Sequence, residues 1–368
     1  MKASDFRFPR RRFAANGHLA TESPMWQVPG AGWRVVLTLA LIFGFSLAAL
    51  SQESLPEQRV GTVKLQPEVV EAVNSGLAWL AKNQAEDGHW GSNHASADTA
   101  LGLMAFLLQG HMSETGVYGR NIENAIAYLL NLGKKQQGYL GSPSNHAGMY
   151  EHGLAVLALS EAWGQSKNRK IGPALKKAVT ITLRAQNPKG GWRYNPDPKD
   201  ADMSMTGMHI VALNSAKEAG IYVPDATLVK AAKYVLSCQD ETSGGFGYTS
   251  SGGPGFARTG AGVLSLILCG QRKHPSVKRG MMFLRAYPEN KFKSAAGRLL
   301  YAQYYAIQCM YQSGNADFNS WYPKITSTLL SKQQSDGSWN MEEGASYSTP
   351  MAILIIGVPY RFLPIYQR

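Results

Sequence analysis

The sequence has little cysteine. Only three cysteines occur in 368 residues, and Cys238, Cys269 and Cys309 show neither the close spacing of a zinc site nor the even number of a disulfide scaffold. All three lie in apolar stretches with helical spacing, so we expect them to be small buried residues. An oxidising environment outside the cytoplasm would permit one disulfide between two of them. We expect no metal ion and no other cofactor.

Charge is also sparse, at 17% of residues against 44% hydrophobic residues, a balance typical of a globular protein with a large core. Acidic residues are fewer than basic ones, 25 against 37, which gives a net charge of +12. Aromatic residues do not interleave with the basic clusters as base stacking would require. We therefore expect a solvated basic outer face, compatible with weak binding to anionic lipid, and no nucleic-acid partner.

Residues 1–51 differ from the rest of the chain. A basic stretch ends at Arg34 and precedes an uncharged apolar run of 16 residues, Val35–Leu50. That length is short for a membrane span, which needs about 20 residues, and suits a secretory signal. We expect export, with cleavage near Ser51 favoured over retention as a membrane anchor, and hence a secreted, periplasmic or membrane-anchored protein. Met25 is an alternative start that would leave an ordinary leader.

A short phrase recurs at a spacing of about 50 residues: a glutamine at the end of an apolar helical run, a turn with glycine, and an aromatic residue. Near Tyr287 a sixth, degenerate copy has lost its glutamine and glycines. The pattern predicts six helix pairs in a single domain, residues 52–368. The five clear copies are Gln84–Trp90, Gln137–Tyr139, Gln186–Trp192, Gln239–Phe246 and Gln334–Trp339.

The two helices of each repeat differ in character. The first, as in residues 121–136, carries a charged stripe, which indicates one face in water. The second, as in residues 149–164, is apolar nearly all round, which indicates burial on both sides. An outer ring and an inner ring of helices are the expected result.

The recurring phrase has a mechanical explanation. It lies where the first helix ends with unpaired carbonyls, so the amide is expected to satisfy backbone groups and the aromatic residue to wedge neighbouring repeats together. We interpret these residues as structural rather than catalytic: Gln84, Trp90, Gln186, Trp192, Gln239, Phe246, Gln334 and Trp339.

This phrase resembles the glutamine-tryptophan repeat of the terpene cyclase and protein prenyltransferase superfamily, whose fold is a barrel of six inner and six outer helices. The resemblance extends from about Pro67 to the C-terminus and implies an all-α (α/α)6 toroid. Particular segments resemble the exported, bacterial single-toroid proteins with squalene-cyclase-like prenyltransferase repeats: MYEHGLAVLALSEAWG, AQNPKGGWRY and DMSMTGMHIVALNSAKEAG.

The catalytic motifs of the superfamily are not matched. Class II terpene cyclases carry an Asp-x-Asp-Asp-Thr acid, and its counterpart is Ala95–Thr99, in which only Asp98 remains and Ala97 stands at the position of the proton donor. The helix that corresponds to the zinc site of protein prenyltransferases reads RLLYAQYYAIQC, without the Asp-x-Cys pair. Zinc-dependent prenyl transfer is therefore not expected.

In a helical barrel a site is expected in the central cavity, beside the N-terminal ends of the inner helices. The catalytic candidates are Asp98, Glu151 and Asp202, although Asp98 and Asp202 also suit helix caps. His209 also suits a core histidine, and the arginines also suit structural ion pairs. The expected cavity residues are His94, Tyr150, His152, His209, Arg258, Arg298, Tyr301, Tyr305 and Tyr347.

Two classes of function remain. The first is a binding toroid that holds an apolar small molecule, an isoprenoid or other lipid, or a peptide segment, without the family's catalytic motifs. The second is an enzyme, either a cyclase or isomerase of the terpene cyclase type that uses a cavity carboxylate, or a glycan-active glycosidase or lyase with paired carboxylates. An aromatic-walled pocket with a buried carboxylate of raised pKa would favour terpenoid ligands, and exposed tryptophans would favour glycans.

Overall fold

The computed structural model describes residues 65–143, 146–166, 168–288, 298–360 and 363. The predicted leader 1–51, including Val35–Leu50 and Met25, lies outside these residues. The described residues form twelve α-helices and no strand. The outer helices are α1 (Pro67–Lys82), α3 (Gly119–Lys135), α5 (Ile171–Arg184), α7 (Asp225–Ser237), α9 (Pro275–Arg285) and α12 (Asn315–Leu330). The inner helices are α2 (Ala95–Leu108), α4 (Gly148–Ser166), α6 (Met203–Glu218), α8 (Phe256–Leu266), α11 (Leu299–Ser313) and α13 (Ala345–Ile356).

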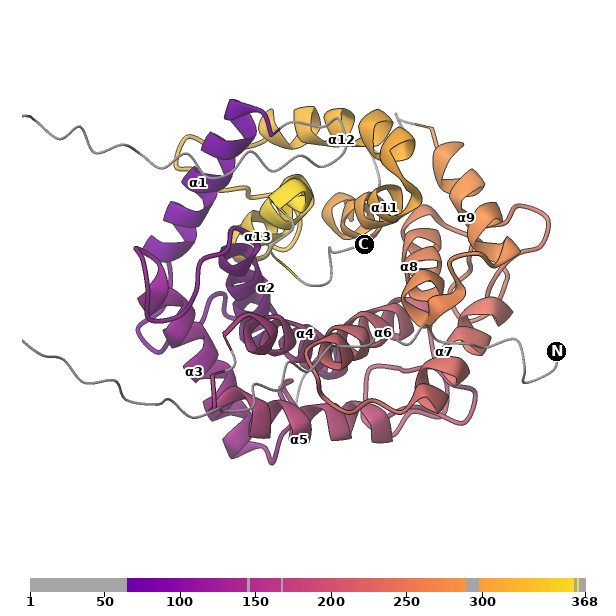
Figure 1. Cartoon of the computed structure of the whole chain (residues 1–368), viewed down its shortest axis with the longest axis horizontal. Helices are drawn as coiled ribbons and strands as arrows, with labels where there is room; N and C mark the ends of the chain where they lie inside the picture. Colours follow the sequence, from indigo (N-terminus) through magenta and orange to yellow (C-terminus); the bar gives the residue numbers. More distant parts are fainter. Residues whose placement is uncertain (1–64, 144–145, 167, 289–297, 361–362, 364–368) are drawn as a thin grey trace, which may run out of the picture. The chain divides into compact units, whose positions relative to one another are not determined.

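The inner helices close into a ring. Each inner helix packs against the two inner helices beside it in chain order, and α13 also packs against α2. Each outer helix packs against the inner helix that precedes it around the ring, so α1 packs against α13. Helix α1 also contacts α12, which joins the first repeat to the last (Figure 1). The prediction of an all-α toroid of six helix pairs is confirmed.

The hydrophobic pattern explains which helices are inner and which are outer. In α3 the buried side chains Ile122, Ala125, Ile126 and Leu129 follow the three-and-four spacing of one helix face. In α2 every residue from Ser96 to Leu108 is buried, because inner neighbours lie on two sides and an outer helix lies behind. Burial on several sides accounts for the nearly uniform apolar composition of the inner helices.

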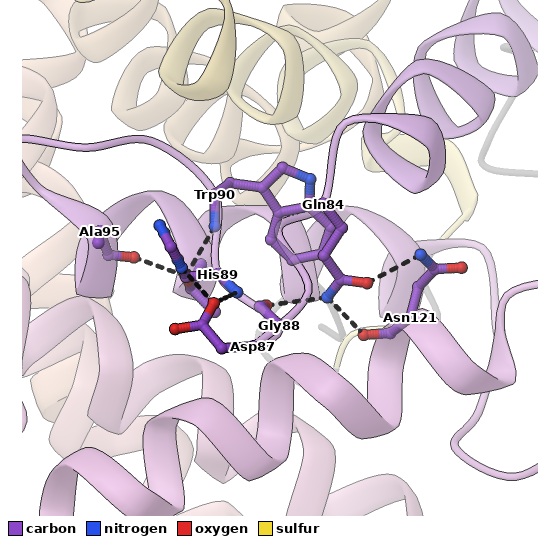
Figure 2. A network of polar contacts seen from close by, with 8 residues as sticks. Gln84, Asp87, Gly88, His89, Trp90, Ala95 and Asn121 are labelled. Carbon is purple, nitrogen blue, oxygen red and sulfur yellow. Dashed lines mark hydrogen bonds and ion pairs between the residues drawn. The ribbon is translucent and has the colours of Figure 1, made fainter.

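The glutamine of the phrase links two repeats. Gln84 Nε2 donates to Gly88 O within its own loop and to Asn121 O at the start of the next outer helix, both at 2.9 Å (Figure 2). Gln186 and Gln239 make the same pair of bonds, to Gly190 and Thr227 and to Gly244 and Ser276. Each amide thus replaces hydrogen bonds that two exposed backbone segments would otherwise make with water.

In the last repeat the linking side chain is that of Gln333, one residue before Gln334. Gln333 Nε2 donates to Gly337 O at 2.9 Å and to Ala72 O of α1 at 2.8 Å, which closes the ring between last and first repeats. Gln334 instead donates through its backbone N–H to Ser338 O. The sequence alone does not say which glutamine of the doublet makes the link. The rotation of the chain at the end of α12 directs the side chain of Gln333 toward α1.

The aromatic residue of the phrase is held at two points. The indole N–H groups of Trp90, Trp192 and Trp339 donate to carbonyls ten residues earlier, at the end of the outer helix, at 2.7–2.8 Å. The backbone N–H of each aromatic donates to a threonine on the following inner helix: Trp90 to Thr99, Trp192 to Thr206, Phe246 to Thr259 and Trp339 to Thr349. The phrase therefore joins the outer and inner helices of one repeat.

The glycine before the aromatic residue permits this close packing. Gly190 has φ 98°, and a Cβ added there would lie 2.3 Å from Lys230 O on the next outer helix. Any side chain would separate the two repeats.

The three cysteines are buried and unpaired within the described residues. Cys309 Sγ contacts Gly260 O at 3.2 Å, between α11 and α8. Burial raises the pKa of the Cys269 thiol to about 12, so this residue behaves as a small apolar side chain.

None of the described helices combines the length and the apolar composition that a bilayer span requires.

Candidate functional site

A cavity of about 860 Å³ lies at the end of the ring where the inner helices begin. All six inner helices contribute residues from their first two turns, and the loops that precede these helices contribute the remainder. We call this space the mouth cavity. From the inner helices its lining includes Ala97, Asp98, Tyr150, Glu151, Leu154, Ser204, Met205, Ala257, Arg258, Tyr301, Ala345 and Tyr347.

Eight of the candidate residues named from the sequence line this one cavity. They come from five inner helices and two preceding loops, so the chain brings together positions more than 240 residues apart. They are His94, Asp98, Tyr150, Glu151, Arg258, Arg298, Tyr301 and Tyr347.

Asp98 is the buried carboxylate of the mouth cavity. Its exposed fraction is 8%, and no described residue donates a hydrogen bond to its side chain. Its pKa is raised to about 7, mainly by burial, while His94 lowers it and the nearby charges of Glu151 and Glu343 raise it. The side chain thus stays partly protonated near neutral pH.

Gly91 explains how the loop packs over this carboxylate. Its φ is 72°, and a Cβ added there would lie 1.9 Å from Asp98 Oδ2. Glycine alone lets the backbone approach the carboxylate this closely.

Glu151 is held in a fixed position beside Asp98. Its Oε1 lies 2.8 Å from His94 Nδ1, and its Oε2 accepts a hydrogen bond of 2.8 Å from the Ser142 N–H. Only 2% of the Glu151 side chain is exposed, whereas 42% of the His94 side chain is. The pair therefore presents an imidazole to the cavity and a carboxylate behind it.

Three tyrosines form a second part of the wall. The rings of Tyr150 and Tyr301 have centroids 6.5 Å apart. Tyr347 lines the same cavity, and burial raises the pKa of its phenol well above the usual range. The phenols stay neutral and offer ring faces together with hydroxyl groups.

The structure does not place His152 in the cavity, contrary to the prediction. The ring is fully buried behind α4, where Nδ1 accepts from the Leu140 N–H at 3.0 Å and Nε2 lies 3.2 Å from Ala178 O. Burial lowers its pKa to about 4. Leu140 occupies the position that the aromatic residue of the phrase has in other repeats. Its backbone N–H therefore donates to His152, where the N–H of that aromatic residue elsewhere donates to a threonine.

His209 and Tyr305 also lie outside the lining. His209 is fully buried, and its ring packs against Trp192 with centroids 5.6 Å apart. Neither of its ring nitrogens has a hydrogen-bond partner among the described residues. Burial lowers its pKa to about 3, so it is neutral. Tyr305 is 1% exposed and packs edge-on against Tyr301 and Tyr304. Both are core residues of the ring.

Asp202 caps α6 instead of facing the cavity. Its Oδ1 accepts from the Met205 N–H at 2.9 Å, and its Oδ2 lies 3.2 Å from Arg193 Nη1. This carboxylate has no exposed surface. The contacts of Asp202 are those of a helix cap, the alternative role that the sequence also suggests for this residue.

Four cavity residues escape the sequence reasoning: Tyr194, Tyr248, Glu342 and Glu343. The two tyrosine hydroxyls lie 2.5 Å apart, and the Arg193 guanidinium stacks over both rings at 5.0 and 5.3 Å. The spacing in the sequence is a signal for the two tyrosines, because each follows the aromatic residue of the phrase, Trp192 or Phe246, by two residues. The acidic pair precedes the last inner helix, and its charge is the corresponding signal.

Metal binding can be assessed from the side chains that lie together. In the part of the chain that the structure describes, no three His, Cys, Asp or Glu side chains are close enough to hold a metal ion.

A family model, the prenyltransferase alpha-alpha toroid domain, matches residues 96–298. A search of curated proteins found no sequence that matches this chain.

The fold is similar to solved structures of two kinds. One is a variant of the type II terpene cyclase MstE from Scytonema in complex with merosterolic acid A, its product, with TM-score 0.55 and 14% identity over 80% of this chain and 98% of that chain. The other is an inactive variant of an α-1,6-mannanase from Salegentibacter sp. in complex with α-1,6-mannotriose, with TM-score 0.59 and 11% identity over 80% of this chain and 99% of that chain. At such identity the likeness concerns the fold.

Proposed function

This chain belongs to the prenyltransferase alpha-alpha toroid domain family, and from that membership we propose that its mouth cavity binds a ligand with an apolar body, an isoprenoid or another lipid. The lining carries this proposal: all six inner helices converge on about 860 Å³ of space, within the usual range of roughly 300–1,000 Å³ for small-molecule sites. Five tyrosines provide the aromatic surface. A peptide segment with apolar side chains would meet the same surface.

Binding without the family's proton donor is supported by the identity of one lining residue. Ala97 faces the cavity at the position where the resemblance implies the donor of class II cyclases, and a methyl group donates no proton. The neighbouring Leu154 and Met205 add apolar surface.

A second candidate function is acid-catalysed rearrangement of an isoprenoid chain, and Asp98 supports it. This carboxyl group lines the cavity, has no hydrogen-bond donor among the described residues, and has its pKa raised to about 7 mainly by burial. A carboxylic acid that stays partly protonated near neutral pH suits proton transfer to an alkene. The neighbouring tyrosine faces would stabilise positive charge that develops on the chain.

Thermal unfolding with and without geranylgeraniol tests the binding proposal. A bound ligand at about 100 times its Kd adds about 2.7 kcal/mol, which raises the Tm of a domain of this size by about 5 °C. Ala97→Leu extends a side chain into the cavity and should reduce this shift, whereas Ala226→Leu makes the same change on the exposed surface of α7 and should not.

Three results would decide between the candidates. No shift with geranylgeraniol, and no apolar molecule that copurifies in native mass spectrometry, would contradict the binding proposal. Conversion of geranylgeraniol to a cyclic product that Asp98→Asn abolishes would favour the enzyme. Binding of α-1,6-mannotriose in place of the isoprenoid would favour the glycan-active alternative.

We also propose that the protein works outside the cytoplasm, either released or held at the membrane by its N-terminal segment. The support comes from the sequence of Val35–Leu50 and the basic residues before it. Fractionation of producing cells, followed by mass spectrometry of the N-terminus, tests this. Recovery of the intact chain from the cytosol alone would contradict it.

A further inference from the structure

The charge of the mouth cavity is opposite in sign to that of the protein. The chain has a net charge of +12, yet the cavity is lined by four carboxylates and two guanidinium groups. The carboxylates are those of Asp98, Glu151, Glu342 and Glu343. A site for an anionic ligand in so basic a protein would be expected to gather arginine and lysine instead.

Most of these charged groups already have partners within the chain. Glu151 contacts His94 and the Ser142 N–H, and Glu342 accepts from the Leu300 N–H at 2.9 Å. Arg258 donates to Gly253 O at 2.6 Å. Asp98 differs, because it is 92% buried and receives no hydrogen bond from a described residue while it lines the cavity.

The N-termini of α6 and α11 do not turn the cavity into a site for anions. A helix N-terminus attracts anions through its free N–H groups and its dipole. At α6 and α11, however, the chain's own carboxylates accept from these groups: Asp202 from the Met205 N–H and Glu342 from the Leu300 N–H. Phosphate oxygens at these two helix starts would have to displace carboxylates that are already bound.

Aromatic rings line the same cavity as the unpartnered carboxylate. Tyr150 and Tyr301 are neighbours, with ring centroids 6.5 Å apart, and Tyr347 lines the same cavity as both of them and Asp98. The face of an aromatic ring attracts an organic cation, and tyrosine rings next to a carboxylate are a usual environment for ammonium groups.

We propose that the ligand of the mouth cavity carries an ammonium group on its apolar body, and that this group lies between the Asp98 carboxylate and the rings of Tyr150, Tyr301 and Tyr347. The inference rests on the proposed function and specifies its ligand class, a cationic amphiphile. The apolar body then lies against Leu154, Met205 and the alanines of the lining. An isoprenoid diphosphate fits the same space poorly, because its phosphates would face the carboxylates.

Three probes with the same eight-carbon chain test this inference by isothermal titration calorimetry at pH 8, below the concentrations at which they form micelles. They are octyltrimethylammonium, 1-octanol and octanoate. We expect octyltrimethylammonium to bind about tenfold more tightly than 1-octanol, since a cation gains both the carboxylate and the ring faces, and octanoate to bind most weakly.

Variants separate the charge contribution from the ring contribution. Asp98→Asn should weaken octyltrimethylammonium about tenfold and leave 1-octanol unchanged, whereas Glu218→Gln, an exposed change at the opposite end of α6, should alter neither. Tyr347→Phe keeps the ring and should keep the preference for the cation, and Tyr347→Leu should lose much of it. Circular dichroism of each variant establishes that it is folded.

Two results would overturn the inference, and they are distinguishable from failure of the proposed function. If 1-octanol binds as tightly as octyltrimethylammonium, or if Asp98→Asn weakens both equally, the cavity binds apolar ligands without regard to charge. If none of the three probes binds and geranylgeraniol does not bind either, the proposed function fails and the inference fails with it.

Discussion

Replacement of Asp98 by asparagine should stabilise the protein, and the gain should depend on pH. The carboxylate is buried, with no hydrogen-bond donor among the described residues, and its pKa is about 7 in the folded protein against 3.8 for a free aspartate. The charged groups that act on it are His94 from the preceding loop, Glu151 from α4 and Glu343 from the loop before α13. Asparagine has nearly the same shape and carries no charge.

The sign follows from proton linkage. A carboxyl group whose folded pKa is raised binds its proton more tightly in the folded state, so stability falls as pH rises from about 4 to about 7 and then stays level. The difference between about 7 and 3.8 corresponds to about 4 kcal/mol. Asp98→Asn should therefore leave the free energy of unfolding nearly unchanged at pH 4 and increase it by about 2–4 kcal/mol at pH 8.

Urea unfolding followed by circular dichroism at pH 4, 6 and 8 measures this difference. Glu218→Gln is the control, because it removes an exposed carboxylate from the same protein. A stabilisation by Asp98→Asn that is equal at all three pH values, or a loss of stability at pH 8, would refute the reasoning. It would mean that the carboxylate is solvated or that it is paired with a cation in solution.

Three further changes test other parts of the structure. Gly91→Ala should destabilise the fold by about 1–3 kcal/mol and weaken octyltrimethylammonium binding, because its Cβ would lie 1.9 Å from Asp98 Oδ2; a variant with unchanged melting and binding would contradict this. Trp192→Ala should cost about 3–5 kcal/mol in urea unfolding, and Trp192→Phe, which resembles the natural Phe246, less than half as much; equal losses would argue against the packing role. His209→Phe should increase stability by about 1–3 kcal/mol at pH 5, since burial lowers the histidine pKa to about 3 and the neutral ring has no hydrogen-bond partner; a destabilised variant at that pH would indicate a partner.

The repeat phrase predicted the ring because its contacts are local and are repeated. Each copy, as at Gln186 and Trp192, joins an outer helix to its loop, to the inner helix and to the next repeat, so its presence in the sequence implies those neighbours. The same logic failed by one residue at the doublet Gln333–Gln334. Composition does not distinguish the two glutamines, and only the phase at the end of α12 does.

The site was harder to predict because facing the cavity depends on helix rotation. Successive residues on a helix point about 100° apart, so Tyr150 and Glu151 reach the cavity while His152 turns toward α5. The sequence placed all three in one polar cluster. Tyr194 and Tyr248 were missed for a different reason, since they lie in loops whose path depends on contacts between repeats, such as the bond from the Met203 N–H to Tyr248 O.

The energetic cost at Asp98 is itself informative about function. Other buried acids near the mouth cavity are compensated, as Asp202 is by the Met205 N–H and Arg193, so the fold has the means to satisfy a carboxylate. At Asp98 it does not, and Gly91 is shaped to let the loop pass over the carboxylate without donating to it. Local rules of stability are broken most often where a residue serves another purpose. An ammonium group of the ligand would supply the missing partner, and its binding would then recover much of the stability that ionised Asp98 removes. Ligand affinity and ligand-induced stabilisation should therefore rise together with pH through about 7, where Asp98 loses its proton.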